Sequence, residues 1–324
     1  MIVFYTYDFP KDIEHQIESL LMLKISIYSV LRELRNEIKF IVVFSNNPKE
    51  IKKKMNVNDE ILFFKKVNNK HSEYIKTLPL HYRYDGGFND ENEHFRKIDK
   101  SYGIAHARTF LSYYLAKKYK SDILYLDFDT GIAKGKGRKC IEKLNRSSIM
   151  LEPLTSYSIL NQICQIYPRI DKKSLPEYIN PYACRWNCGI MFVRYNDYNL
   201  KFMKDVKRFY FSLSKDLGFM QSSDEWAIGL ALFYNKIIPD ITFDNISFYV
   251  PGFLKFLHKN LDLSNGFVHY MDQKNIYSGQ RKWKNMLNNW QNYFEGNCKE
   301  PSFNTPNYFM KNSNELIWGR FELI

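Results

Sequence analysis

Two aspartates stand one residue apart at the end of an apolar run, in the segment SDILYLDFDT at residues 121–130. Because side chains alternate along a strand, Asp127 and Asp129 are expected to leave the backbone on the same side, with Phe128 between them. Two carboxylates that close repel each other unless something positive joins them. A divalent cation, a basic side chain or plain solvent at a loop would each answer that need. Mg²⁺ or Mn²⁺ takes oxygen ligands and keeps positions open for phosphate oxygens, so the pair suits a site for a metal-bound diphosphate.

The elements that must position this pair alternate between strands and helices. Apolar, β-branched runs indicate buried strands, and apolar residues at helical spacing indicate helices between them. This alternation predicts an α/β fold with a mostly parallel, Rossmann-like sheet flanked by helices, and ligands at the carboxyl ends of the strands. Strands are expected at 1–9, 38–45, 60–67, 122–127, 148–154, 188–195 and 241–250. Helices are expected at 11–36, 101–120, 197–215 and 223–235, and a loop at 69–98.

Composition and motifs exclude several classes of protein. The chain has 324 residues, of which 45% are hydrophobic and 17% aromatic, as in globular proteins. No apolar run approaches the roughly 20 residues of a membrane helix, and the start MIVFYTYDFP does not have the pattern of a signal peptide. The segment GIAKGKGRK at 131–139 fails as a P-loop, because Gly137 follows Lys136 where Ser or Thr is required. Neither GxGxxG after the first strand nor GxSxG is present, which disfavours dinucleotide-binding enzymes and common hydrolases.

The chain is basic, with a formal net charge of +12 and a sequence pI near 9.2. Such a charge attracts nucleic acid, anionic membrane surfaces or phosphate-bearing ligands. The basic residues are spread out and no RNA-binding signature appears, so no nucleic-acid partner is expected. The run KGKGRK at 134–139 suits an acidic acceptor or membrane phosphates, or is simply an exposed loop before a helix. Five scattered cysteines without zinc-site spacing indicate a reduced, cytoplasmic protein, with membrane-peripheral attachment as a further expectation.

Four segments follow one another in the order and spacing of a known enzyme family. They are AHARTFLSYYLAKKYKSDILYLDFDT (105–130), WNCGIMFV (186–193), SSDEWAIGLAL (222–232) and VHYMDQKNIYSGQRKW (268–283). Over about residues 1–283 the chain therefore resembles the GT-A-fold retaining glycosyltransferases that include glycogenin and bacterial lipopolysaccharide galactosyltransferases. In that family, a helix with an arginine precedes the strand that delivers an Asp-x-Asp motif, and here Arg108 has that place.

The resemblance implies a metal site and its surroundings. Mn²⁺, or Mg²⁺, would be held by Asp127, Asp129 and His269, and Asp127 would also contact the sugar or ribose. Arg108 would hold the sugar or a phosphate, or pair with Asp127. Thr130 and Gly131 would form the turn that leads the chain away from the sugar.

The resemblance also places the nucleotide. The base would lie against Thr6, Tyr7 and Asp8, with Tyr7 stacking on it and Asp8 bonding to its edge, although a plain turn at the strand end fits these residues equally. The diphosphate would be bound by a basic loop that closes over it and excludes water. The candidates in that loop are Lys274, Arg281 and Lys282, for which a solvated charge run is the alternative.

The catalytic residues implied by the resemblance are Asn187, Asp224 and Glu225. Asn187 would contact the transferring sugar. Asp224 or Glu225 would stabilise positive charge near the anomeric carbon or assist an acceptor hydroxyl. Acidic residues in the first turn of a helix also stabilise that helix, and both roles can hold at once.

Together these features predict a metal-dependent enzyme that moves a hexose from a nucleotide-diphospho-sugar, expected to be a UDP-sugar, with retention. The acceptor would be a glycan, a glycolipid or another lipid-linked acceptor, or a glycoprotein. Residues 1–130 would form the nucleotide-sugar half, residues 131–285 the acceptor-binding and catalytic half, and 286–324 an extension without an assigned role. The alternatives are a nucleic-acid-binding or -processing metal enzyme and a catalytically inactive scaffold of the same fold.

Overall fold

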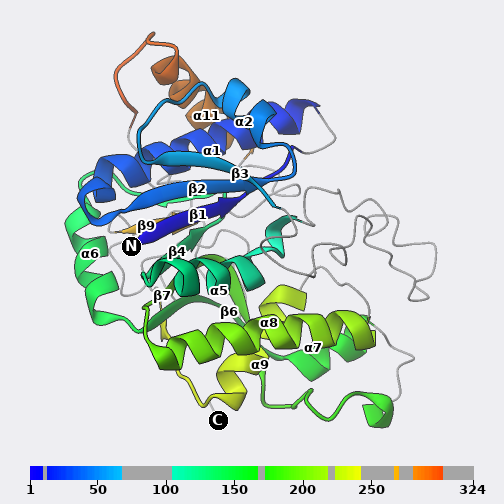
Figure 1. Ribbon diagram of the computed structural model, residues 1–324. Coiled ribbons are helices and arrows are strands. Elements are labelled where there is room, and N and C mark those ends of the chain that lie inside the picture. The colour runs from blue at the N-terminus through cyan, green and yellow to red at the C-terminus, as the bar shows by residue number, and fades with distance from the viewer. Residues whose placement is uncertain are drawn as a thin grey trace, which may run out of the picture.

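The protein is described by a computed structural model, which covers residues 1–9, 13–67, 104–166, 172–217, 223–241, 266–269 and 280–301. A seven-stranded sheet lies between two layers of helices (Figure 1). The strands are β1 (Ile2–Thr6), β2 (Phe40–Ser45), β3 (Leu62–Lys66), β4 (Ile123–Leu126), β5 (Thr130–Ile132), β6 (Ile149–Ser158), β7 (Cys184–Val193), β8 (Asp240–Ile241) and β9 (Phe267–His269). The α-helices are α1 (Ile13–Leu34), α2 (Pro48–Met55), α5 (Arg108–Tyr119), α6 (Gly137–Arg146), α7 (Ile159–Ile166), α8 (Asp197–Leu217), α9 (Ser223–Tyr234) and α11 (Gln280–Phe294).

The predicted α/β architecture is confirmed, with bounds shifted by a few residues. The strand expected at 241–250 is described only as β8, and the loop expected at 69–98 lies outside the described residues. The sequence patterns did not indicate α2, α7, α11 or β5.

Strand direction brings the middle of β7 to the carboxyl end of β4. The sheet order is β3-β2-β1-β4-β7-β6-β8, and β1 to β4 are parallel. β7 runs antiparallel to both β4 and β6. Leu126, the last residue of β4, therefore pairs with Ile190, and the backbone N–H of Asp127 donates to the carbonyl of Gly189 at 2.8 Å. Residues in the first half of β7 thus reach the edge of the sheet where β4 ends.

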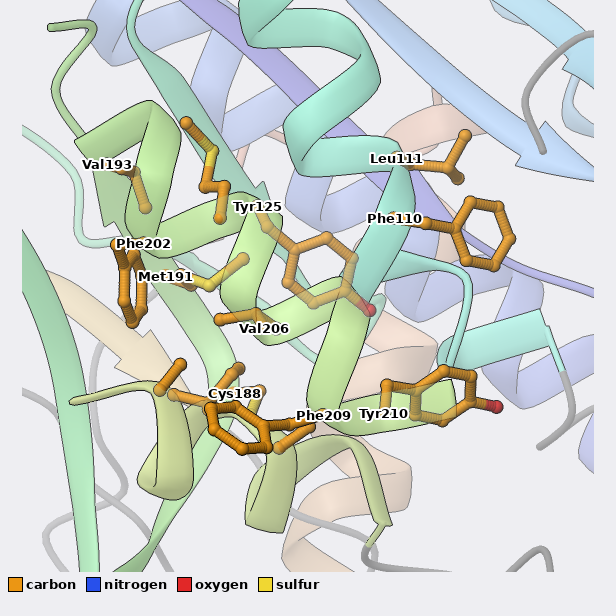
Figure 2. Close-up of a cluster of buried hydrophobic side chains, with 14 of the residues drawn as sticks. Phe110, Leu111, Tyr125, Cys188, Met191, Val193, Phe202, Val206, Phe209 and Tyr210 are labelled. Atoms are coloured by element: carbon orange, nitrogen blue, oxygen red, sulfur yellow. The ribbon is translucent and has the colours of Figure 1, made fainter. Parts of the chain in front are cut away.

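The two faces of the sheet are covered by different helices. Val3 and Tyr5 pack with α1, α2 and α6 in one buried cluster, whereas Ile2 and Phe4 pack with α5, α8 and α9 in another. This division follows from the alternation of side chains along β1. Figure 2 shows the second cluster, in which Tyr125 of β4 lies among apolar side chains with its hydroxyl at the end of the ring.

A second, two-stranded sheet ties the chain after β4 to its C-terminal part. β5 pairs antiparallel with β9, so that Thr130 is opposite His269 and Ile132 is opposite Phe267. Thr130 and Gly131 were expected to form a turn. Thr130 does close the turn that begins at Asp127, but it is also the first residue of β5, and Gly131 lies inside that strand opposite Val268. Three-residue strands are too short for hydrophobic periodicity to reveal them.

Helix α11 packs over this small sheet and against α1, beside which it lies in Figure 1. Trp290 is fully buried in a cluster with Leu21 and Ile25 of α1 and Val268 of β9. Beyond the helix, the carboxylate of Glu300 contacts α1 and the end of β5 at once. Its partners are the guanidinium of Arg32, the hydroxyl of Tyr28 at 3.1 Å and the ammonium of Lys134 at 3.6 Å.

The glycine-rich basic run at 134–139 lies where β5 leads into α6. Residues 134–136 form the predicted loop before a helix, and the last three residues of the run belong to the first turn of α6. The backbone N–H groups of Gly135 and Gly137 both donate to the carboxylate of Glu33 at 2.9 Å, and α6 begins at Gly137. A Cβ at Gly137 would lie 2.2 Å from the carbonyl oxygen of Glu33, so this close approach requires glycine. The amide groups that would cradle a phosphate in a P-loop therefore bind a carboxylate of the chain itself.

The five cysteines are free thiols. Within the described ranges, no helix combines the length and apolar character that crossing a bilayer requires.

Candidate active site

Asp127, Asp129 and His269 meet beyond the end of β4. One ligand atom from each lies within 4.8 Å of the other two, and Nε2 of His269 is 3.5 Å from Oδ1 of Asp129. Asp127 and Asp129 were expected to lie in the strand and to share one side of it, but they lie beyond its end. Instead Leu126 ends β4, and a turn closes where the N–H of Thr130 donates to the carbonyl of Asp127 at 3.1 Å. This turn, rather than strand alternation, brings the two carboxylates together.

His269 reaches Asp129 because two features of the backbone allow it. β9 pairs with β5 and so carries His269 back to the residues that directly follow Asp129. Its imidazole then lies against the bare Cα of Gly189 on β7. A Cβ at Gly189 would be 2.1 Å from Cε1 of His269 and within 2.8 Å of both ring nitrogens. The glycine of the Asn-x-Gly motif therefore provides the space for the imidazole.

Gly189→Ala is expected to displace His269 and to weaken binding of Mn²⁺ by about 10- to 100-fold, the range found when groups that orient metal ligands are lost. Manganese binding, measured by titration calorimetry, checks this. The control is Gly296→Ala, because no atom lies within 4 Å of its added methyl group, although its φ of +78° makes alanine strained there. Unchanged manganese affinity in Gly189→Ala would contradict a role of this glycine in placing His269.

The three residues fit a divalent cation. Asp129 and His269 are buried, and Asp127 is partly buried. Burial raises the pKa of Asp129, and the neighbouring His269 opposes that rise. Two carboxylates and one imidazole supply the oxygen and nitrogen donors that such cations accept, and a bound cation would relieve the repulsion between the carboxylates.

Arg108 joins this cluster to the start of α9. Its Nε and Nη2 atoms lie 2.7 and 2.5 Å from Oδ2 of Asp224, and Nη1 donates to both carboxylate oxygens of Asp127 at 3.1 and 3.2 Å. Burial disfavours the charge on Arg108, but Asp224 and Asp127 outweigh it and hold the pKa of Arg108 well above its usual range. Of the roles predicted for Arg108, the structure shows the pairing with Asp127.

Asp224 and Glu225 are neighbours in sequence but have different surroundings. Asp224 is fully buried; besides Arg108, it accepts a hydrogen bond at 2.9 Å from the backbone N–H of Glu225. Burial opposes the ionisation of Asp224, yet Arg108, followed by His106, outweighs it and lowers its pKa. The carboxylate of Glu225 instead pairs with Arg185 of β7. Asp224 therefore anchors Arg108, and Glu225 belongs to a separate ion pair.

Tyr125 connects the end of β1 with the aspartate turn. Its hydroxyl donates to Oδ1 of Asp127 and lies 2.9 Å from the hydroxyl of Thr6. Arg108 lies over its ring, with 5.3 Å between the guanidinium carbon and the ring centroid. Thr6 is thereby linked to Asp127 of the candidate metal site through the hydroxyl of Tyr125.

Tyr7 and Asp8, predicted to receive a base, are held by protein groups. The ring of Tyr7 is 2% exposed, packs edge-on against Phe9 and Phe128, and its hydroxyl lies 2.8 Å from that of Ser19. Oδ1 of Asp8 accepts hydrogen bonds from the hydroxyl of Ser45 at 2.6 Å and from the backbone N–H of Asn46 at 2.8 Å. The ring that was expected to stack on a base is thus buried and in contact with two aromatic rings of the protein.

The remaining predicted residues differ in how far the structure describes them. Asn187 is 3% exposed, and its side-chain oxygen accepts a hydrogen bond from the N–H of Gly189 at 2.6 Å. This bond lies where the pairing of β7 with β6 shifts register. Lys274 lies outside the described residues. Arg281 and Lys282 lie in the first turn of α11, where their side chains are not described.

Three residues of the site were not predicted to act there from the sequence: Tyr125, Arg185 and Gly189. A signal existed for two of them. Tyr125 precedes Asp127 by two residues and Arg185 precedes Asn187 by two, so strand alternation puts each on the same side as a predicted site residue. The ion pair of Arg185 with Glu225 of α9 could not be read from this spacing. The role of Gly189 depends on a contact with β9, which the sequence did not indicate.

The chain was compared with known proteins. The model of the family described as Glycosyl transferase family 8 matches residues 5–249. Among solved structures, the galactosyltransferase LgtC in complex with donor and acceptor sugar analogs has a TM-score of 0.52 at 14% identity, over 89% of this chain and 95% of its own. Mouse xyloside xylosyltransferase 1 in its apo form has a TM-score of 0.49 at 12% identity, over 85% of this chain and 100% of its own. No match was found among curated protein sequences.

The likeness to LgtC concerns the fold, because so low an identity supports nothing finer. Together with the sheet described above, it confirms the predicted GT-A architecture. The family match extends over most of the chain and contains Arg108, both aspartates of the turn, and the start of α9. The chain therefore belongs to glycosyl transferase family 8 and is a glycosyltransferase.

Proposed function

We propose that the protein transfers a hexose from a nucleotide-diphospho-sugar, with a UDP-sugar as the first choice, in a metal-dependent reaction. The observation that carries this proposal is the convergence of Asp127, Asp129 and His269 at the end of β4, next to Arg108. Mn²⁺ is proposed ahead of Mg²⁺, because one of the three ligands is an imidazole and Mg²⁺ favours oxygen ligands. A bound cation would neutralise the diphosphate and make it a better leaving group.

The residues of the chain would act on the donor in the following way. Asp129 and His269 would hold the cation, and Asp127 would share it while remaining bonded to Arg108 and Tyr125. Asn187 lies at the same edge of the sheet and would contact the transferring sugar. Thr6, Tyr7 and Asp8 would border the nucleotide at the end of β1, and Lys274 and Lys282 would bind the diphosphate and exclude water from it.

Glu225 is the better candidate for the reacting centre. Asp224 is fully buried, with one oxygen bonded to Arg108 and the other to the helix backbone, whereas the side chain of Glu225 is 11% exposed and bonds to Arg185 through Oε2. We propose transfer with retention, during which the carboxylate of Glu225 would stabilise positive charge that develops on the sugar ring. Residues 1–130 would bind the donor and residues 131–285 the acceptor. The acceptor would be a glycan, free or linked to a lipid or protein, and the positive net charge would favour acidic acceptors or a location against an anionic membrane.

A donor screen tests this function. UDP with Mn²⁺ is expected to raise the Tm of the purified protein, because a ligand that binds only the folded state stabilises it by about 2.7 kcal/mol at 100 times its Kd. UDP- and GDP-sugars are then assayed for Mn²⁺-dependent release of the nucleoside diphosphate, with chelator as the control. If neither UDP nor GDP raises the Tm in the presence of manganese, and no UDP- or GDP-sugar is hydrolysed, the proposed function is wrong. Salt-dependent DNA binding in place of nucleotide binding would instead favour a nucleic-acid enzyme.

A further inference from the structure

The ion pair between Arg185 and Glu225 has a different character from the other charged contacts of the site. Nε of Arg185 donates to Oε2 of Glu225, and the side chains of the two are 27% and 11% exposed. Arg108, by contrast, divides its charge between Asp127 and Asp224. Among the described residues, Arg185 is therefore the cation that bonds directly to the carboxylate of Glu225.

The backbone holds the two partners in a fixed relation. Arg185 lies near the start of β7, and Glu225 lies in the first turn of α9. One turn further along α9, Gly229 touches the strand: a Cβ there would be 1.9 Å from the carbonyl oxygen of Cys184. Because the helix packs against the strand without a side chain between them, Arg185 is kept beside Glu225.

Several charged or titratable groups act on Glu225, and they differ in sign. Burial raises the pKa of Glu225, and the charge of Arg185 is the strongest opposing influence. Asp224, its neighbour on α9, raises the pKa further, whereas Arg108 of α5 lowers it. The thiol of Cys188 on β7 is also close, and burial raises its pKa well above the usual range, which keeps it neutral. Arg185 is thus the group that most favours the carboxylate form of Glu225.

We propose that Arg185 is a positioning residue that holds the Glu225 side chain in place as a carboxylate in the donor site. This inference rests on the proposed function, since it assigns to Arg185 the control of the group that would face the reacting sugar. Arg185 forms no bond to the sugar in this scheme and acts only through Glu225. It follows that removing the positive charge at position 185 changes the pH range of activity rather than simply lowering activity at every pH.

The pH profile of Mn²⁺-dependent donor hydrolysis tests the proposal. In Arg185→Gln, the loss of the positive charge raises the pKa of Glu225, so the acid limb of kcat/KM moves to higher pH. At pH 6 we expect kcat/KM to fall by about 10-fold relative to wild type, with a smaller loss at pH 8. Arg185→Lys keeps the charge and is expected to restore most of the acid limb. The matched control is Arg138→Gln, which removes the exposed ion pair with Glu142 on α6. An acid limb in Arg185→Gln that coincides with that of wild type would overturn the proposal.

Thermal unfolding separates this inference from the proposed function, because it needs no substrate. Arg185→Gln leaves a buried carboxylate without its cation, so its Tm is expected to fall by roughly 3 °C at pH 8 and by less at pH 5, where Glu225 takes up a proton. Adding Glu225→Gln to that variant removes the charge and with it this pH dependence. If Arg185→Gln lowers the Tm by the same amount at pH 8 and pH 5, and the double variant shows the same two decreases, Arg185 does not act on Glu225. If wild type hydrolyses no donor but these shifts appear, the ion pair stands and the proposed function fails.

Discussion

Asp129→Asn is expected to reduce Mn²⁺-dependent donor hydrolysis by at least about 10³-fold, since a metal that stabilises leaving-group charge supplies several kcal/mol to the transition state. Asparagine keeps the size of the side chain and removes the charge that would hold the cation. The carboxylate of Asp129 is buried beside His269. In the described part of the chain, Asp127, Asp129 and His269 form the one group of side chains whose ligand atoms lie close enough together to hold a metal ion. Initial-rate assays across a range of Mn²⁺ concentrations check the prediction.

The control for this substitution is Asp197→Asn, at the exposed start of α8, far along the chain from the aspartate turn. It changes the same net charge and is expected to leave hydrolysis within about two-fold, because surface substitutions have small effects. Hydrolysis by Asp129→Asn at the wild-type rate and with the wild-type dependence on manganese would remove Asp129 from the metal site.

Arg108→Met is expected to destabilise the protein by about 3–5 kcal/mol, the cost of removing one partner from a buried ion pair. Asp224 is fully buried and would lose its bonds to Nε and Nη2, while Asp127 would lose its contacts with Nη1. Methionine occupies a similar volume, so the effect reports the charge more than a cavity. Urea unfolding at pH 7 measures it.

The pH dependence of that loss identifies its cause. In wild type the pKa of Asp224 is lowered, so its contribution to stability is present at neutral pH and is lost as the pH falls through the folded-state pKa. In Arg108→Met burial dominates and raises that pKa, so the variant is expected to be closest to wild type in acid. Adding Asp224→Asn should recover part of the stability at pH 7. A loss that is independent of pH and unaffected by Asp224→Asn would indicate repacking of α5 instead.

The sequence predicted the parts of the site that local patterns encode. Asp127 and Asp129 follow an apolar strand, and Arg108 lies on the helix before it, so their proximity follows from one strand and its preceding helix. The main strands were likewise found from their apolar runs, and α1, α5, α8 and α9 from apolar residues at helical spacing. The charged helix α2, with the sequence PKEIKKKM, has few apolar residues from which to recognise a buried face.

Other parts depend on pairings that no local pattern contains. The apolar run of β7 does not indicate its direction, yet only the antiparallel direction brings Asn187 and Gly189 to the end of β4. Asp224 and Glu225 are adjacent acidic residues, and the sequence alone does not distinguish their roles. They differ in the folded chain because Asp224 pairs with Arg108 of α5 and Glu225 pairs with Arg185 of β7.

The pairing of β5 with β9 also sets the time at which the site can first exist in a newly made chain. Asp127 and Asp129 leave the ribosome early, but β5 has no partner until residues 267–269 are synthesised. At about 5–20 residues per second, the third ligand follows the first two after a delay on the order of 10 s. Until then the N-terminal strands can assemble, but the aspartate turn lacks His269. The candidate metal site is therefore complete only after residues 267–269 have been made and have paired with β5.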